Sequence, residues 1–265
     1  MKKRITELLL IDLLFLLLLI ISGMVKGIWG EALYLLAYIL PIGAGLFLLR
    51  RHGIFSEPSA LVLGKDKLLF SASLFAPTTL LVIAVSALTT LVLAFFGKTN
   101  EVDVSGHLVY ELFRHALIPA VLEELLFRYI PIKILSPKSK RGAIWVSALL
   151  FALIHLNLFQ IPYALLAGAV LAFLTVVSGS ILPAIILHFL NNSVSVLWMR
   201  NPDVAPAVII PVLVFLSVIS AVYIVRKRRE YVEETVRAFS GDRVGFSAEL
   251  LVMTALCLIM SFLSL

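Results

Sequence analysis

Two adjacent glutamates and an arginine interrupt one of the most apolar stretches of this chain. The segment 116–135 reads ALIPAVLEELLFRYIPIKIL and contains Glu123, Glu124 and Arg128. Each charge at the centre of a membrane helix costs about 2.5–3.5 kcal/mol on insertion scales, whereas each Leu or Ile contributes only about 0.3–0.6 kcal/mol. Such charges face the interior of a helix bundle or pair with one another, and they mark functional positions by default. The segment therefore constrains both the fold and the location of a functional site.

The whole chain is more apolar than a soluble domain. Hydrophobic residues make up 61% of its 265 residues and charged residues only 14%, whereas soluble domains average about 45–50% and about 25%. Apolar runs of about 18 or more residues recur along it, as in proteins that cross a membrane repeatedly. Strands are not expected, because an open sheet edge cannot face lipid and the runs are too long for barrel strands. We expect an all-α, polytopic transmembrane helix bundle that forms a single membrane-embedded domain over residues 1–265.

The apolar runs predict about eight or nine spans, arranged around a polar cavity within the membrane. The first run is long and contains Asp12, so we expect a retained helix rather than a cleaved secretory signal. The spans are expected near residues 5–25, 29–49, 68–96, 116–135, 142–158, 160–178, 181–199, 204–225 and 246–264. Their number depends on the long run at 68–96 and on the very short loops between 156 and 183.

The basic residues alternate between the two ends of these spans. With a cytoplasmic N-terminus, 17 of the 22 lysines and arginines fall in cytoplasmic segments and only Lys26, Lys98, Arg114 and Arg200 fall outside. This asymmetry follows the positive-inside rule and also places the C-terminus outside. The cytoplasmic set consists of Lys2, Lys3, Arg4, Arg50, Arg51, Lys65, Lys67, Lys133, Lys138, Lys140, Arg141, Arg226, Lys227, Arg228, Arg229, Arg237 and Arg243. We therefore expect an integral protein of the cell membrane, with lipids rather than nucleic acid as partners of its net charge of +6.

Two further features limit the function less. Residues 226–245 read RKRREYVEETVRAFSGDRVG and form the longest polar stretch. Acid–base pairs at a spacing of four predict a cytoplasmic surface helix there, whose simplest role is that of a solvated linker near lipid headgroups. The single cysteine, Cys257, lies in an apolar run and allows no internal disulfide.

The charged helix predicts one paired and one free carboxylate. Glu124 and Arg128 are four residues apart, so they share a helix face and can pair. Glu123 is rotated by about 100° from Glu124 and points elsewhere. A cluster that only fixes helix packing is the alternative, but an extra unpaired acid within lipid favours a functional role.

Two later apolar runs contain the other polar residues expected at membrane depth. One contains Phe151-x-x-x-His155, and the other contains His188-x-x-x-Asn192, whose side chains share a helix face. Either element alone could be a hydrogen bond between helices, worth about 0.6–2 kcal/mol. At about 1.5 Å per residue, Glu123 lies roughly 15 Å below Lys133, and both histidines lie at a similar depth. The four side chains could therefore meet in a cavity near the middle of the membrane that opens to the cytoplasm.

Together these elements resemble the three motifs of a known family. Glu-Glu-x-x-x-Arg, then Phe-x-x-x-His, then His-x-x-x-Asn on a later helix are similar to the motifs of the CPBP intramembrane proteases. That family includes the type II CAAX prenyl endopeptidases and the bacteriocin-immunity (Abi) proteins. The resemblance covers residues 123–192 within a core motif region at 116–199, and all motif positions are filled.

The resemblance implies proteolysis by an activated water rather than by a covalent nucleophile. It implies that Glu123 and His155 activate the water, and that His188 and Asn192 bind the oxyanion of the tetrahedral intermediate. It further implies supporting roles for Glu124 and Arg128. The expected substrate is a membrane-anchored peptide, such as a prenylated protein of the CAAX type.

The residues themselves agree with this chemistry but leave the metal open. Peptide hydrolysis needs a general base and donors aimed at the developing negative charge, and His and Asn side chains can both donate. No Ser–His–Asp triad is visible in the sequence. We expect no cofactor, but Glu123, His155 and His188 could instead hold Zn²⁺ with a water in the fourth position. The sequence lacks His-Glu-x-x-His, and Asn192 suits an oxyanion hole better than a metal.

Two other classes of function remain open from the sequence. A non-catalytic scaffold or bacteriocin-immunity protein would keep the polar set for binding. A transporter or proton relay would also place acids and histidines inside the membrane. Transport is disfavoured because the chain shows no repeated half and no pair of matching broken helices.

Overall fold

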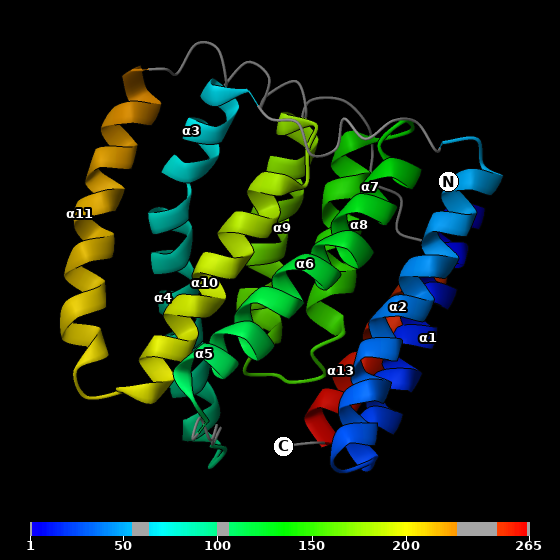
Figure 1. Ribbon diagram of the computed structural model, residues 1–265, viewed down its shortest axis with the longest axis horizontal. Coiled ribbons are helices and arrows are strands. Elements are labelled where there is room, and N and C mark those ends of the chain that lie inside the picture. Colours follow the sequence, from blue (N-terminus) through cyan, green and yellow to red (C-terminus); the bar gives the residue numbers. More distant parts are fainter. Residues whose placement is uncertain (1, 55–63, 100–105, 227–247, 264–265) are drawn as a thin grey trace.

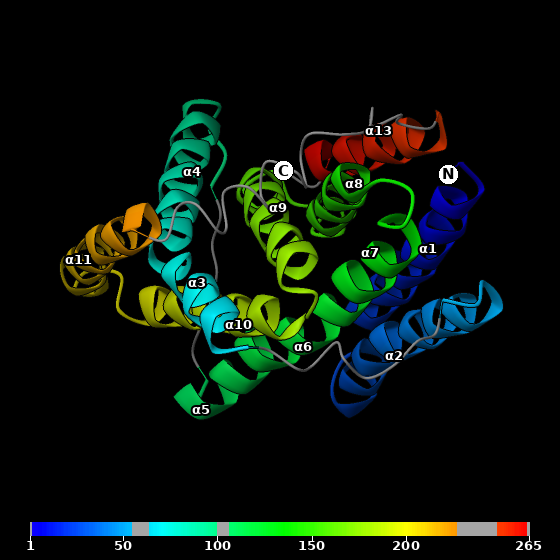
Figure 2. The ribbon, with the colours of Figure 1, turned by 90° about the horizontal axis from the view of Figure 1, so that it is seen from above.

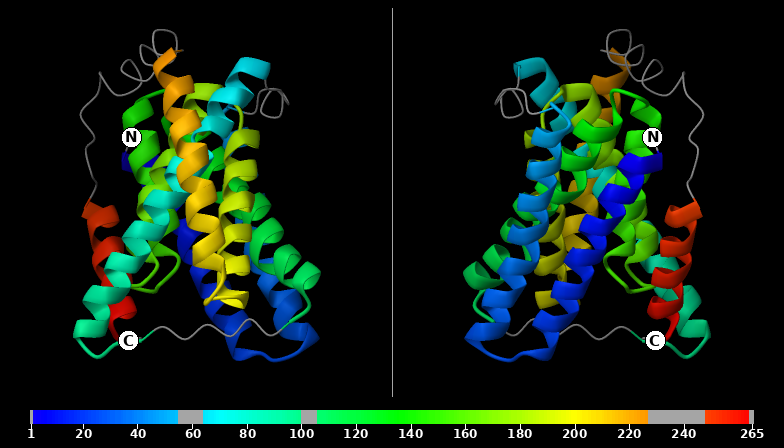
Figure 3. Two further views of the ribbon diagram at one scale, coloured as in Figure 1. Left: turned by 90° about the vertical axis from the view of Figure 1, so that its left-hand side faces the viewer. Right: turned by 90° about the vertical axis from the view of Figure 1, so that its right-hand side faces the viewer.

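The computed structural model describes residues 2–54, 64–99, 106–226 and 248–263, and all of their regular structure is helical. The helices run up and down in one bundle, with the N-terminus and the C-terminus at opposite ends (Figures 1 and 3). The all-α polytopic prediction is thereby confirmed. The predicted cytoplasmic connection at 226–245 falls almost wholly outside the described residues.

The N-terminal half is built from long apolar helices. Helix α1 (Lys2–Met24) packs along α2 (Ile28–Arg51), and a second pair of segments, α3 (Lys65–Ser73) and α4 (Phe75–Phe95), follows in one continuous run. The broken central segment then comprises α5 (Leu108–Glu111), η2 (Leu112–Leu117), α6 (Ile118–Glu124), η3 (Leu125–Tyr129) and α7 (Ile130–Leu135), of which η2 and η3 are π-helical turns. The remaining helices are α8 (Lys140–Leu153), α9 (Ile161–Ser178), α10 (Leu182–Arg200), α11 (Ala205–Arg226) and α13 (Ala248–Leu263).

Within the described residues, six helical segments are long and apolar enough to cross a membrane: α1, α2, α3–α4, α9, α10 and α11. An 18-residue helix such as α9 is about 27 Å long, close to the hydrocarbon thickness of a bilayer. Three of the predicted spans do not meet this criterion. The segment 116–135 carries four charges, Glu123, Glu124, Arg128 and Lys133, and α8 and α13 have only 14 and 16 residues.

Two prolines explain why the central segment is not a regular α-helix. Proline has no N–H group and cannot donate to the carbonyl four residues before it. Each π-helical turn ends two residues before a proline, η2 before Pro119 and η3 before Pro131. The carbonyl of Phe127, four residues before Pro131, instead accepts a hydrogen bond from the Ser147 hydroxyl on α8. The distorted turn is therefore held by a side chain of the neighbouring helix, and such turns occur frequently at functional sites.

The later part of the central segment, η3 and α7, packs against α1, α2, α8 and α9, whereas α5 lies at the edge of the bundle (Figure 2). Fully buried side chains from α1, η3, α7 and α8, including Phe15, Phe127, Ile134 and Leu150, form one apolar core there. In contrast, α4 and α11 lie at the periphery and expose most of their apolar side chains. The exposed apolar faces of α4 and α11 suit contact with lipid. The charged side chains at positions 123, 124 and 128 are instead buried among the surrounding helices.

Basic residues gather at the helix ends on one side of the bundle. The start of α1, the end of α2, the starts of α3 and α8, and the end of α11 all lie at one end of the bundle (Figure 1). These helix ends carry Arg4, Arg50, Lys65, Lys140 and Arg226 among others. The positive-inside rule makes this end the expected cytoplasmic side.

Candidate active site

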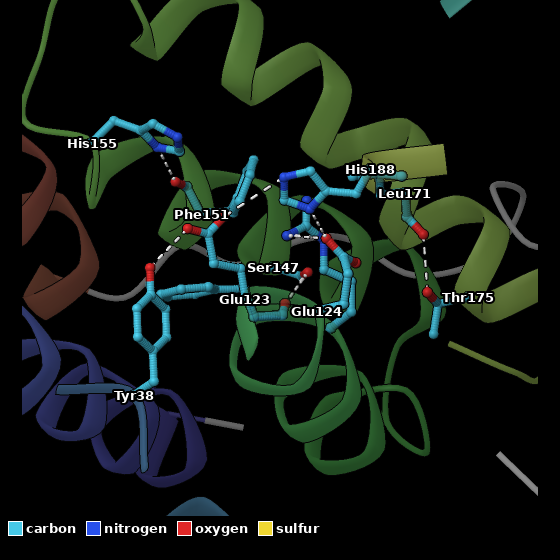
Figure 4. Close-up of polar contacts among 11 residues, drawn as sticks. Tyr38, Glu123, Glu124, Ser147, Phe151, His155, Leu171, Thr175 and His188 are labelled. Atoms are coloured by element: carbon cyan, nitrogen blue, oxygen red, sulfur yellow. Dashed lines mark hydrogen bonds and ion pairs between the residues drawn. The ribbon is translucent and has the colours of Figure 1, made fainter. Parts of the chain in front are cut away.

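Five helical elements bring the candidate site together. Glu123 and Glu124 are the last residues of α6, and Arg128 follows on η3. His188 lies in the middle of α10, and His155 follows the end of α8 by two residues. Figure 4 shows the two glutamates and the two histidines around the ring of Phe151, together with Tyr38 from α2.

Glu124 is the carboxylate of the site that pairs with Arg128, through one of its two oxygens. Its side chain is fully buried, and its Oε1 lies 3.1 Å from Nη1 of Arg128. The same oxygen lies 2.8 Å from Nδ1 of His188. The predicted pair between Glu124 and Arg128 is therefore present, and the structure adds a histidine to it.

Arg128 is a fully buried cation with unusual surroundings. The ring of Phe151 lies beneath its guanidinium group, with Cζ 3.9 Å from the ring centroid. None of its three guanidinium nitrogens makes a hydrogen bond of good geometry with a described residue. The short distance to Glu124 is thus an electrostatic contact rather than an aligned hydrogen bond. Charge attraction and the aromatic face hold this cation in place.

Glu123 has different partners from its neighbour. The Tyr38 hydroxyl donates to Oε1 over 2.9 Å, and Oε2 lies 3.7 Å from Nε2 of His188. That second distance exceeds a hydrogen bond. One carboxylate oxygen is therefore fixed, and the other remains available beside an imidazole.

His188 lies between the two carboxylates (Figure 4). A carboxylate can only accept, so Nδ1 carries the hydrogen that binds an ionised Glu124. This fixes the ring orientation and directs Nε2 towards Glu123. Nε2 accepts a proton when the ring is neutral and donates one when the ring is an imidazolium.

His155 lies on the other side of Phe151. Its Nδ1 donates to the carbonyl oxygen of Phe151 over 2.9 Å, which leaves Nε2 with a lone pair. The Phe151 ring meets both imidazoles edge to face, at centroid distances of 5.0 Å to His155 and 5.6 Å to His188. No hydrogen bond or ion pair joins His155 to Glu123 within the described residues, so a shared water would have to connect them.

Asn192 completes the predicted set. It follows His188 by one helical turn on the same face of α10. Its side chain is half-buried, and it makes no hydrogen bond to any other residue that the structure describes. The carboxamide is therefore free to bind a ligand.

The structure adds two aromatic residues that the sequence did not single out. Tyr38 binds Glu123, and the Tyr34 hydroxyl lies 3.4 Å from that of Tyr38. Arg114 in turn lies over the Tyr34 ring, 3.7 Å from its centroid, and binds Glu31. The only signal in the sequence was the spacing of two tyrosines by four residues within an apolar run.

The arrangement does not form a ready metal site. Across the described ranges, no group of three or more His, Cys, Asp or Glu side chains is placed to hold a metal ion. Glu123 and His188 are neighbours, but His155 uses Nδ1 on a carbonyl and lies beyond Phe151. These three side chains therefore do not fit a zinc site as they are placed. A chelator experiment tests the zinc-dependent alternative.

Comparisons with known proteins identify one family. Neither the curated proteins nor the solved structures contain a match to the chain. Residues 105–194, about a third of the chain, match the family described as Type II CAAX prenyl endopeptidase Rce1-like. This segment contains both glutamates, Arg128, both site histidines and Asn192, whereas Tyr38 lies outside it. Through this segment, the chain is similar to the type II CAAX prenyl endopeptidases, which supports the resemblance to the CPBP intramembrane proteases.

Proposed function

We propose that this protein is an intramembrane endopeptidase that hydrolyses a peptide bond in a membrane-anchored substrate, of the prenylated CAAX type, with a water activated by Glu123 and His155. The observation that carries this proposal is the difference between two adjacent glutamates. Oε1 of Glu124 contacts both Arg128 and His188, and its Oε2 is fully buried, out of reach of a water, with no hydrogen-bond partner among the described residues. Glu123 is slightly exposed and keeps Oε2 free next to an imidazole. A general base needs such a free oxygen, and the family match supports proteolysis.

The first step is attack by water. Oε2 of Glu123 takes one proton from the water, whose other hydrogen binds the Nε2 lone pair of His155. The water oxygen then bonds to the carbonyl carbon of the substrate, and the carbonyl oxygen becomes an oxyanion. The hydroxyl of Tyr38 acts on the opposite oxygen of Glu123 and holds the carboxylate in the orientation that the attack requires.

The second step needs donors for the oxyanion. Nε2 of His188, as an imidazolium, and the carboxamide of Asn192 donate to it. Glu124 holds that ring through Nδ1, and Arg128 lies 3.1 Å from the same oxygen of Glu124. The proton held by Glu123 then passes to the leaving nitrogen, and the C–N bond breaks to give a carboxyl group and an amine.

We further propose that the site opens to the cytoplasmic side, with the N-terminus in the cytoplasm. The clustering of basic helix ends at one end of the bundle supports this orientation. A substrate with a lipid anchor in the same leaflet would present its peptide to that side.

A cleavage assay on the purified full chain tests the proposal. The protein in liposomes is incubated with farnesylated and unmodified versions of one CAAX-type peptide, and the products are identified by mass spectrometry. We expect cleavage of the farnesylated peptide next to the modified cysteine, its loss in Glu123→Gln, and its persistence in the presence of a chelator. Absence of cleavage of any membrane-anchored peptide, or equal cleavage by Glu123→Gln, would overturn the proposal. Loss of activity with the chelator and its recovery with Zn²⁺ would establish the metal-dependent alternative.

A further inference from the structure

A cavity separate from the candidate site opens among the ends of three helices. Its volume is about 140 Å³. Its polar lining includes Lys133 and Ser136 at the end of the central segment, Lys140 at the start of α8 and Thr175 near the end of α9. Val176 and Ile181, at the end of α9 and just before α10, supply part of an apolar wall. A cavity needs only about 10–15 Å³ of such volume to hold one water, so this cavity has room for several waters or for a larger polar group.

The charge inside this cavity is positive and unbalanced. Among the residues that the structure describes, no acidic side chain lines it. Neither Lys133 nor Lys140 forms an ion pair within the described part of the chain, and the only recorded contact of the Lys133 ammonium is with the Tyr129 ring, at 5.9 Å. The carboxyl ends of α7 and α9 each contribute about half a negative charge and the amino end of α8 about half a positive one. Two full lysine charges exceed this small negative sum, so the cavity attracts an anion.

The position of the cavity identifies the source of that anion. Gly179, the residue that follows α9, lines the cavity. Helix α9 is just long enough to cross the hydrocarbon layer. The cavity therefore lies at the level of lipid headgroups, at the end of the bundle where basic residues gather. Apolar walls beside two ammonium groups fit a phosphate that is attached to a glycerol and acyl chains. Basic pockets between membrane helices on the cytoplasmic side bind anionic headgroups in this way.

We infer that this cavity binds the headgroup phosphate of an anionic phospholipid through Lys133 and Lys140. The bound phosphate joins the end of the central segment, which bears Glu123, to the start of α8. Helix α8 leads in turn to His155. This inference does not depend on the proposed protease activity, because its test measures binding alone.

The test compares lipids and lysine variants with the purified full chain in an uncharged detergent. Native mass spectrometry counts the bound phosphatidylglycerol and phosphatidylcholine of identical acyl chains, and thermal unfolding is followed with each lipid and with inorganic phosphate. We expect wild-type protein to retain phosphatidylglycerol preferentially and to unfold at a higher temperature with it. Lys133→Gln and Lys140→Gln should each weaken its retention about fivefold.

Lys138→Gln is the matched control, because this exposed lysine lies on the same turn but does not line the cavity. It should leave retention unchanged. Equal retention of the two lipids, or an equal loss in Lys138→Gln, would overturn the inference. Equal stabilisation by inorganic phosphate would show a free-anion site rather than a lipid site. If Lys133→Gln fails to fold, the exposed Lys140 still carries the test.

Discussion

The two adjacent glutamates of the central segment differ in exposure and in the charge of their partners. Glu124 is fully buried and has two charged or ionisable partners on one oxygen, Arg128 and His188. Glu123 is 8% exposed, binds the neutral hydroxyl of Tyr38 and faces His188 across 3.7 Å. One residue of helix rotation thus separates a fully buried carboxylate that contacts a cation from a slightly exposed carboxylate whose second oxygen faces an imidazole.

This difference shows how a membrane protein can keep a reactive acid. The cost of burying Arg128 is offset by Glu124 and by the Phe151 ring, so Glu123 is not needed as its counter-ion. His188 links the two carboxylates, since each nitrogen of its ring faces one of them. Substitutions at Glu124 should therefore act mainly on stability, and substitutions at Glu123 mainly on rate.

The largest effect is expected from Glu123→Gln. The amide keeps the size of the side chain but cannot accept the proton of the attacking water, so turnover should fall about 10²–10⁴-fold. Thermal unfolding of the variant should stay close to wild type, because no buried charge loses its partner. Turnover numbers and melting temperatures measured on the same preparation check both parts. Cleavage at the wild-type rate by Glu123→Gln would show that Glu123 is not the general base.

The reverse pattern is expected from Glu124→Gln. This change leaves Arg128 buried without a counter-charge, and breaking a buried ion pair in this way costs about 3–5 kcal/mol. We expect a large drop in the midpoint of chemical denaturation in detergent. Arg128→Met together with Glu124→Gln removes both charges and should recover much of the loss. A double variant no more stable than the single one would contradict an ion-pair role.

Much of this comparison could be predicted from the sequence, because it depends on local helix geometry. A spacing of four residues placed Glu124 and Arg128 on one face, and apolar length located the spans. The prolines at 119 and 131 were visible, but their π-helical turns were not predicted, because such turns also depend on a donor such as Ser147 from another helix.

The contacts between distant helices could not be predicted in the same way. Tyr38 reaches Glu123 across 85 positions of sequence, and a tyrosine in an apolar run is as typical of a membrane interface as of a site. The end of α8 was also missed. The span at 142–158 was expected to continue past His155, whereas the helix ends at Leu153 and the His155 ring binds the Phe151 carbonyl. Leu156, with a φ of 46°, then turns the chain away.

A smaller effect on turnover is expected from Asn192→Ala. Removal of one donor to an oxyanion lowers turnover about 10²–10³-fold. Stability should change little, because this half-buried side chain makes no hydrogen bond within the described structure. Asn191→Ala, one residue earlier and on another face of α10, is the matched control and should keep its activity. Similar losses in both variants would point to damage to α10 rather than to a lost donor.

The smallest effect, and the sharpest test of the environment of Glu123, is expected from Tyr38→Phe. The ring and its packing against Phe15 remain, and only the hydroxyl that orients the carboxylate is lost. A hydrogen bond to a charged group is worth about 1.5–3 kcal/mol, so kcat should fall about 10–100-fold with little change in KM. Infrared spectra should show a shift of the Glu123 carboxylate band, which Glu123→Gln identifies by its absence.

Tyr34→Phe serves as the control for Tyr38→Phe, because it keeps the ring beneath Arg114 and removes a hydroxyl that does not touch Glu123. Its kcat and infrared band should match wild type. If Tyr38→Phe left the band in place while Glu123→Gln abolished cleavage, Glu123 would remain the base and the tyrosine would only fill space. If both tyrosine variants moved the band equally, the hydrogen-bonded chain from Arg114 to Glu123 would act as one unit, and orientation of the base could not be assigned to Tyr38 alone.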